Sequence, residues 1–204
     1  MVRKRNWLMT LMIILPLALV ASCGQYGEVD QGRVVKFDKE KWTATIIRDK
    51  ANDSRNPDYS HLPPMTYALP KDPMEMGQEP RPGGRMKLDT KAKQIVIFDP
   101  AAQNFKTLDY TLIDQQENVE KTDPLVYDAA EKKAKKFPAV DKEKKTIAIY
   151  SGRQKILVTF SLPDEYFALP DSTWDAGDEI RVYYHKEGVA QRCMNVTTTD
   201  IYKK

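Results

Sequence analysis

The stretch DKEKWT at residues 38–43 and the stretch DKEKKT at residues 141–146 decide how this chain is organised. Each is a charged turn that leads into an apolar run, Ile46-Ile47 in the first case and residues 147–149 in the second. A polar turn next to such a run predicts a β-hairpin. The two stretches lie 103 residues apart, so an internal duplication is predicted.

Two further pairs of segments follow in the same order. TYALP at residues 66–70 matches TFSLP at 159–163, where proline ends an alternating strand because it cannot donate to the ladder. GGRMKL at 83–88 matches GDEIRV at 177–182, and each of these is a glycine turn that enters a strand. Their spacings are 93 and 94 residues, so the first copy holds about ten extra residues. We assign these to the polar loop 48–64, where insertions are tolerated.

Strand signals continue at residues 94–98 and 190–197, so each copy holds about five short strands. The predicted fold is mainly β: two tandem, internally duplicated, five-stranded barrels that resemble the OB type at the level of architecture. Small SH3-like barrels and sandwiches share this pattern and remain alternatives. Residues 164–170 are predicted to form a helical turn over the mouth of the second barrel.

The predicted division follows from the duplication and from the N-terminus. Asp128 is placed to cap a short helix between the two copies, and Pro138 is placed to end it. The predicted parts are a signal peptide (1–22), a tether (23–31), a first barrel-like domain (32–126), a linker or short helix (127–136) and a second barrel-like domain (137–204).

The N-terminus has the layout of a cleaved signal. Arg3, Lys4 and Arg5 precede an apolar run at residues 7–21, which is shorter than the roughly 20 residues that a membrane-spanning helix needs. The run ends in VASCG at residues 20–24, which resembles the lipobox of bacterial lipoproteins. Cleavage is therefore predicted between Ser22 and Cys23.

The thiol of Cys23 is the predicted lipidation site, and the lipid bilayer is the partner that it implies. Two or three acyl chains give stable anchoring, whereas one chain binds only marginally. Gly24 follows the cysteine, where enteric lipoproteins kept in the inner membrane carry aspartate. The expected location is the cell envelope, with the outer membrane facing the periplasm favoured.

Charge and cysteine content limit the possible functions. The chain has 32 Lys and Arg and 29 Asp and Glu; without the three basic signal residues the two counts are equal at 29. Nucleic-acid binding needs a net basic surface, so it is not expected. With Cys23 acylated, Cys193 has no intramolecular partner, and we expect it to be a buried, inert thiol.

No motif specifies a reaction, so no catalytic residue is predicted. The two histidines, His61 and His185, stand far apart and outside any metal-binding or haem-binding motif. We therefore expect no metal and no cofactor. The acidic residues Asp178 and Glu179 are adjacent on a strand, point to opposite faces and cannot form a glycosidase pair by themselves.

Aromatic residues gather in the second copy and suggest an interface. Tyr166, Trp174 and Tyr184 are the candidates, because such residues often anchor protein interfaces or stack on sugars. Packing in the core is the alternative role for most of them.

Gly24, GRVV at residues 32–35, IIRDK at 46–50 and WDAGD at 174–178 resemble a family of bacterial lipoproteins, a domain of unknown function found chiefly in sulfate-reducing bacteria. The resemblance covers essentially all of the mature chain. It implies an envelope location and an anaerobic source, and it implies no activity, cofactor or catalytic residue.

Three functions are compatible with these observations. The first is a non-catalytic binding or scaffolding module for a periplasmic or membrane protein, which neutrality, duplication and the lack of a catalytic motif favour. The second is a carbohydrate or peptidoglycan binding protein, because barrels of this type bind oligosaccharides. The third is a hydrolase with an unfamiliar site.

Overall fold

The computed structural model describes residues 26–51 and 57–199, and within them the protein is mainly β, as predicted. None of the helices in these residues is long and apolar enough to cross a membrane. The strands are β1 (Glu28–Asp38), β2 (Thr43–Arg48), β3 (His61–Ala68), β4 (Arg85–Asp89), β5 (Gln94–Asp99), β6 (Asn104–Asp109), β7 (Thr111–Glu117), β8 (Tyr127–Asp128), β9 (Lys133–Ala134), β10 (Ala139–Asp141), β11 (Thr146–Ser151), β12 (Ile156–Ser161), β13 (Glu179–Lys186) and β14 (Val189–Asn195). The helical elements are η1 (Asp164–Ala168), η2 (Asp171–Trp174) and α2 (Val196–Thr199).

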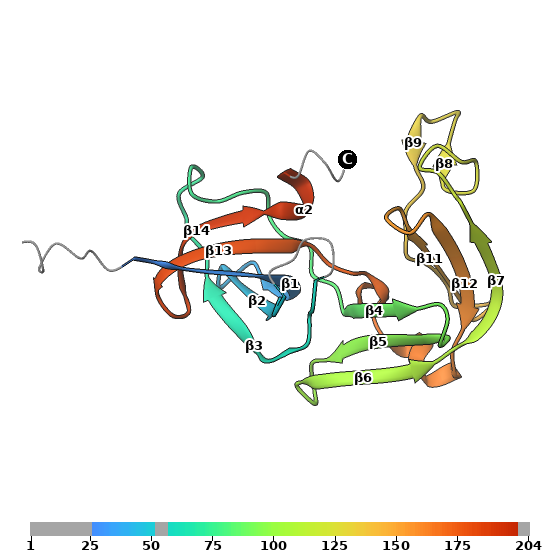
Figure 1. The fold of residues 1–204 in the computed structure, drawn as a ribbon, viewed down its shortest axis with the longest axis horizontal. Helices are drawn as coiled ribbons and strands as arrows, with labels where there is room; N and C mark the ends of the chain where they lie inside the picture. The colour runs from blue at the N-terminus through green and yellow to red at the C-terminus, as the bar shows by residue number, and fades with distance from the viewer. Residues whose placement is uncertain (1–25, 52–56, 200–204) are drawn as a thin grey trace, which may run out of the picture.

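Five strands close into a ring in the order β1-β13-β14-β3-β2 (Figure 1). Neighbouring strands are antiparallel except β14 and β3, which pair in parallel at Val189 and Ala68. The N–H of Ala68 also donates to the carbonyl of Gly188 at 2.9 Å. An apolar cluster that includes Val34, Ile46, Tyr67, Ile180, Val182 and Cys193 fills this ring.

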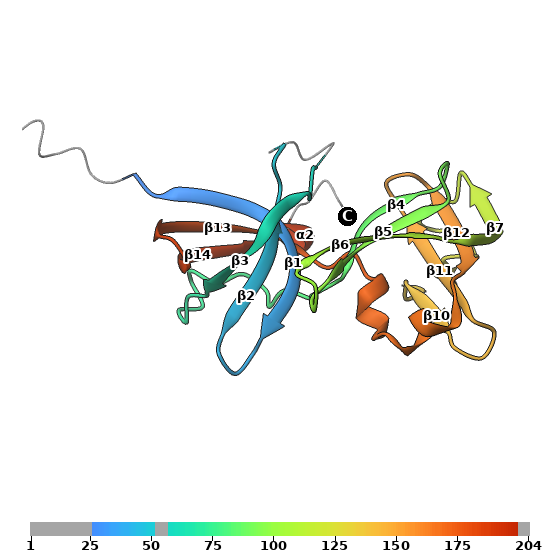
Figure 2. The same cartoon turned by 90° about the horizontal axis from the view of Figure 1, so that it is seen from below.

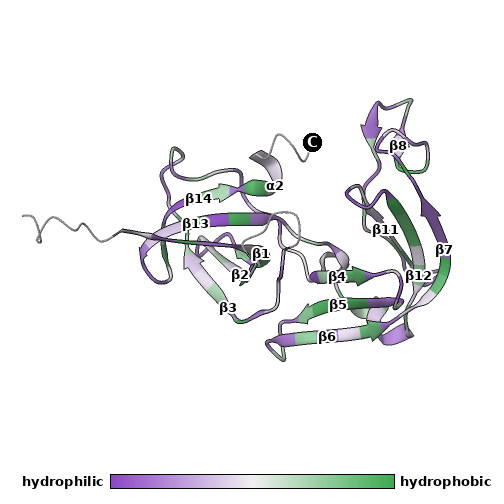
Figure 3. Ribbon diagram, viewed as in Figure 1, coloured by the Kyte–Doolittle hydropathy of each residue, from purple (hydrophilic) through white to green (hydrophobic). Residues whose placement is uncertain are grey.

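The remaining large sheets form a second unit, here called the two-sheet body. One sheet has the order β10-β11-β12-β7 and the other β4-β5-β6 (Figure 2). Apolar residues of both sheets and of η1 and η2 join in one cluster. Its fully buried members include Ile95, Ile147, Val158, Phe160 and Trp174. Figure 3 shows this apolar character along β5 and β12. The two sheets therefore bury their apolar faces against each other.

The matched segments of the two predicted copies have an equivalent residue pair in the strand register. Ala44 pairs with Tyr67 in the first copy, and the matching residues Ile147 and Phe160 pair in the second. The two charged turns also share one hydrogen bond. The Oδ1 atom of Asp38 accepts from the N–H of Lys41, and Asp141 Oδ1 accepts from the N–H of Lys144. Both turns close the predicted hairpins.

The two copies do not form separate barrels, and here the structure differs from the predicted domains 32–126 and 137–204. Strands β1, β2 and β3 of the first copy form the ring with β13 and β14 of the second. Strands β10, β11 and β12 of the second copy share a core with β4 and β5 of the first. Each unit thus combines three strands of one copy with the strands that follow the glycine turn of the other copy.

This exchange requires the two connections to cross, and glycines stand at the crossing. The N–H of Gly83 donates to the carbonyl of Val34 at 2.9 Å. A Cβ atom on Gly83 would lie 2.1 Å from the backbone nitrogen of Gly177, and Gly177 itself has a φ of +69°. Only residues without a Cβ allow this approach.

The predicted linker or short helix at 127–136 is instead a small hairpin, in which β8 pairs with β9. The side chain of Asp128 accepts from the N–H groups of Ala130 and Glu131, so it closes a turn rather than capping a helix. The predicted helical turn at 164–170 is confirmed in part as η1.

The predicted tether 23–31 also ends earlier than expected, because β1 begins at Glu28. Glu28 pairs with Tyr184 across the ladder and accepts a hydrogen bond from its hydroxyl at 3.0 Å. Asp30 pairs with Val182 on the same strand. The polar segment EVDQ at residues 28–31 lacks an apolar strand pattern. It becomes a strand because it pairs with β13 from the other end of the chain.

Candidate functional site

The predicted site residues fall in different environments. Ser22 and Cys23 lie outside the described residues. Trp174 is 0 % exposed in the core of the two-sheet body, so its placement does not support the predicted interface role, and core packing describes it. Tyr184 is 6 % exposed in the ring. Tyr166 is half-buried and lines a pocket.

This pocket has a volume of about 470 Å³ and lies where the ring meets the two-sheet body. Its apolar lining draws on each of the three apolar clusters of the described protein: Phe37 from the ring, Ile97 from the two-sheet body, and Val35 and Phe98 from a small cluster between them. Such a volume is within the usual range for a small-ligand or side-chain pocket. The pocket therefore depends on how the ring and the two-sheet body pack against each other.

One wall of the pocket is a strand edge. β1 pairs with β13 from Glu28 to Arg33, and Val34 completes this pairing through its N–H to the carbonyl of Asp178 at 2.9 Å. From Lys36 to Asp38, β1 pairs with β2 alone among the described strands. Val35, Lys36 and Phe37 line the pocket, so an edge of β1 borders it. We call residues 35–38 on the side away from β2 the open edge of β1.

The other walls come from the crossing connections and from the helical turns. Gly83 and Gly84 present backbone only, and Gly83 is hydrogen-bonded to β1 through the carbonyl of Val34. Tyr166 and Leu169 come from η1 and the residue after it. The N–H of Gly84 donates to the carbonyl of Ser172 at 3.0 Å, which ties these walls together.

Four charged side chains in the lining balance one another. Lys36 and Lys106 are matched by Asp99 and Glu165, so the lining has no formal net charge. The Nζ atom of Lys106 lies 4.9 Å from the centroid of the Tyr166 ring. Its contact with the Tyr166 side chain raises the pKa of Lys106, which keeps this lysine charged and covers one face of the ring.

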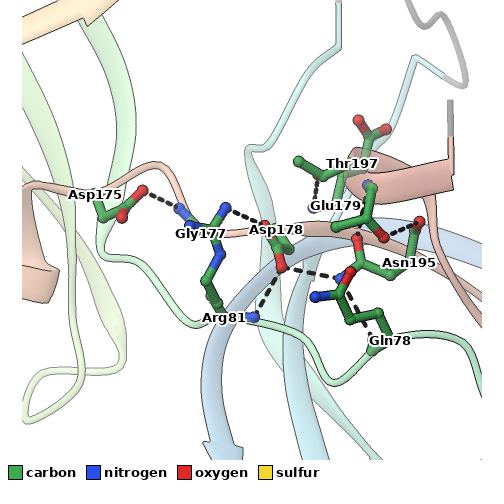
Figure 4. A network of polar contacts seen from close by, with 9 residues as sticks. Gln78, Arg81, Asp175, Gly177, Asp178, Glu179, Asn195 and Thr197 are labelled. Atoms are coloured by element: carbon green, nitrogen blue, oxygen red, sulfur yellow. Dashed lines mark hydrogen bonds and ion pairs between the residues drawn. The ribbon is translucent and has the colours of Figure 1, made fainter. Parts of the chain in front are cut away.

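A polar network around the buried carboxylate of Asp178 holds the crossing (Figure 4). Asp178 is 1 % exposed and accepts from the backbone N–H of Arg81 at 2.9 Å, from the Arg81 guanidinium at 3.1 Å and from Asn195 Nδ2 at 2.9 Å. Glu179, the next residue, instead accepts from the side chain of Gln31. As predicted, the two carboxylates face different partners and do not act as a pair.

A second polar cluster lies in the ring. The Tyr67 hydroxyl donates to Asp30, and the Tyr184 hydroxyl donates to Glu28 at 3.0 Å and to Asp30 at 3.3 Å. Burial raises the pKa of Tyr184 to about 12 and also raises that of Tyr67. Raised values keep both phenols protonated near neutral pH, so they act as hydrogen-bond donors that hold β1 in the ring.

The remaining candidates for chemistry are separate from one another. Cys193 is buried, as expected, and burial raises its pKa to about 11, which keeps the thiol protonated and unreactive. His61 contacts Arg48 at 2.6 Å, and His185 contacts Tyr183 at 3.2 Å. No three His, Cys, Asp or Glu side chains lie together as a metal site within the residues that the structure describes.

Sequence reasoning did not find the pocket. Its wall residues Val35, Lys36 and Phe37 are an ordinary segment of strand, and their one distinguishing feature is the register shift between Val34 and Lys36. Tyr166 was predicted as an interface residue because it is aromatic, and it is the one of the three predicted aromatics that lines the pocket.

Comparisons with known proteins place the chain by family and not by activity. No curated protein and no solved structure matches it. A family model described as a domain of unknown function (DUF4881) matches residues 25–204, which is nearly the whole of the part after the predicted signal. This chain therefore belongs to the DUF4881 family.

Proposed function

We propose that this protein is a membrane-anchored envelope lipoprotein that acts as a non-catalytic binding or scaffolding module for a periplasmic or membrane protein. The observation that carries the proposal is the largely apolar pocket of about 470 Å³, with no formal net charge in its lining, between the ring and the two-sheet body. A concave apolar site with a few polar groups at its margin is the usual form of a binding site.

The proposed anchor is lipid on Cys23, at the end of the VASCG segment. Only four residues, 24–27, separate this cysteine from the start of β1 at Glu28. Fully extended, such a spacer reaches about 15 Å. In this proposal the ring therefore stays close to the bilayer, and the outer membrane facing the periplasm is the favoured location.

Capture experiments with a blocked pocket test the proposed function. Ser172 is an exposed residue of the lining, and its side chain is not needed for the backbone bond to Gly84. Full-length protein and the variant Ser172→Trp should be crosslinked in native membranes, with Ser60→Trp, at an exposed residue outside the pocket lining, as the control. We expect one protein to be recovered with the wild type and Ser60→Trp and to be lost with Ser172→Trp. Equal recovery with all three would contradict a role for the pocket.

Carbohydrate or peptidoglycan binding is the second candidate, and Tyr166 is the observation that favours it. Its half-buried ring lines the pocket, although Lys106 covers one face, and the predicted sugar-stacking residue Trp174 is buried. Sedimentation with purified cell wall tests it. Binding that Tyr166→Ala abolishes would favour this candidate over protein capture.

A further inference from the structure

The open edge of β1 determines what kind of ligand fits the pocket. A strand edge presents unpaired N–H and C=O groups, which are a template for another extended chain. From Glu28 to Val34 this edge of β1 is used by β13, Asp178 and Gly83. From residue 35 to residue 38 the described structure provides no further strand there, and the pocket begins at that point.

The pocket is shaped for an added strand. Gly83 closes the edge at Val34 by its hydrogen bond to that carbonyl, and the pocket of about 470 Å³ beside residues 35–37 is the space in which a peptide backbone would be added. Phe37, Phe98 and Leu169 supply apolar contacts for side chains that point away from the backbone. Four strand residues span about 13 Å at about 3.3 Å per residue, so residues 35–38 can pair with a tetrapeptide.

The charges in the lining also select the ligand. Lys36 and Lys106 are balanced by Asp99 and Glu165, so a phosphate or another polyanion meets no net positive field. Lys106 is in addition held by Tyr166. A peptide backbone has no net charge and many hydrogen-bonding groups, and it therefore complements both the neutral lining and the open edge.

We propose that the pocket binds an extended, uncharged segment of a partner protein, which adds a strand to the open edge of β1 and places an apolar side chain against Phe37, Phe98 and Leu169. This inference rests on the proposed function and specifies the form of the partner. The added segment continues the line of β13 along β1. Recognition by strand addition takes affinity from main-chain bonds and specificity from the pocket for alternate side chains.

Main-chain pairing can be tested with synthetic peptides. The probe is a mixture of capped hexapeptides in which threonine alternates with Val, Ile, Leu, Phe or Tyr. The matched control is the same mixture N-methylated at alternate residues, which removes the main-chain donors of one edge and keeps the side chains. Both are added at up to millimolar concentration to the ¹⁵N-labelled full-length protein in detergent, with and without Ser172→Trp.

We expect the plain peptides to shift the amide signals of residues 35–38 and to slow hydrogen exchange there at least tenfold, and we expect N-methylation or Ser172→Trp to weaken binding at least tenfold. Equal binding of the N-methylated peptides would overturn strand addition. Absence of any shift at residues 35–38, or the same shifts with soluble cell-wall fragments alone, would also overturn it. Pocket-dependent capture of a protein without peptide pairing would leave the proposed function standing and remove this inference.

Discussion

Asp178 accepts a hydrogen bond from the backbone N–H of Arg81 at 2.9 Å, although 97 residues separate them in the chain. The N–H of Asp178 in turn donates to the carbonyl of Arg81 at 2.8 Å. These reciprocal bonds join the two connections at the point where they cross, one leading into the two-sheet body and the other returning to the ring (Figure 4). The pair therefore holds together the exchange of strands between the two copies.

Replacing Asp178 by alanine should destabilise the protein by about 2–4 kcal/mol, because it removes the acceptor of the Arg81 N–H and leaves Asn195 Nδ2 only its long contact of 3.4 Å with the Gln78 carbonyl. Urea unfolding followed by circular dichroism measures this. Asp171→Ala is the control: Asp171 and its partner Lys142 are both more than half exposed, so their ion pair contributes little. Equal stability of the two variants would show that the crossing does not depend on Asp178.

Alanine at Gly83 should disrupt the crossing itself. Its Cβ would lie 2.1 Å from the backbone nitrogen of Gly177 and 2.4 Å from the carbonyl oxygen of Asp175, and neither backbone atom can move alone. We expect a loss of more than about 3 kcal/mol or failure to fold. Gly152→Ala is the matched control, since its nearest neighbour would be a side-chain atom at 3.6 Å. A Gly83→Ala protein that melts like Gly152→Ala would contradict the crossing geometry.

Truncation of Trp174 should reduce stability strongly, whereas truncation of Tyr166 should change it little. Trp174→Ala empties a fully buried site in the two-sheet body and should cost about 3–5 kcal/mol of unfolding free energy. Tyr166→Ala should change stability by about 1 kcal/mol or less, because the ring is half-buried at the pocket. Thermal melts and the capture experiment together separate the two roles. An unchanged melting temperature in Trp174→Ala would exclude its core role.

The tyrosine cluster in the ring predicts a loss of stability at alkaline pH. An unfolded tyrosine titrates near pH 10, whereas burial raises the pKa of Tyr184 to about 12 in the folded protein. The folded state therefore resists deprotonation of Tyr184. The contribution of this hydroxyl to the free energy of unfolding is complete below about pH 10 and is lost as the pH rises from 10 to 12. Between pH 9 and pH 11 the unfolding free energy of the wild type should decrease. In Tyr184→Phe this decrease should be smaller by roughly 1 kcal/mol, a figure already reduced for solvent screening. An identical fall in both proteins would count against this cluster as the source.

The proposed lipid attachment predicts that Cys23→Ser abolishes metabolic labelling with a radioactive or clickable fatty acid, because serine cannot form the thioether. Cys193→Ala is the matched control, since the Cys193 thiol is buried and lies outside the predicted signal. Labelling should persist in the control at the wild-type level. Persistent labelling of Cys23→Ser would remove the proposed anchor.

Much of the local structure could be predicted because it depends on neighbours in the chain. The turns that begin at Asp38 and Asp141 share a hydrogen bond, and the matched strands are found, although β3 begins at His61, inside the predicted loop 48–64. Even the register is repeated, with Ala44 opposite Tyr67 and Ile147 opposite Phe160. These features depend on periodicity and turn chemistry, which are properties of short segments.

The site could not be predicted in the same way. Tyr166 is recognisable as an aromatic residue in a polar segment, but Val35 and Lys36 become pocket residues because the pairing of β1 with β13 stops at Arg33, opposite the first residue of β13. Trp174 carries the same sequence signal as Tyr166 and is buried. Exposure depends on what the rest of the chain packs against each residue.

The sequence by itself determined that the chain is mainly β, that its strand unit occurs twice, and that glycine turns precede the strands at Arg85 and Glu179. Only the tertiary structure decided that each copy completes the other. In both copies a glycine turn is followed by similar strands. The local sequence pattern therefore allows these strands to pair within their own copy or with the other copy. The contacts that distinguish them, Gly83 against Gly177 and Arg81 with Asp178, join residues more than 90 positions apart and exist only once the two connections have crossed.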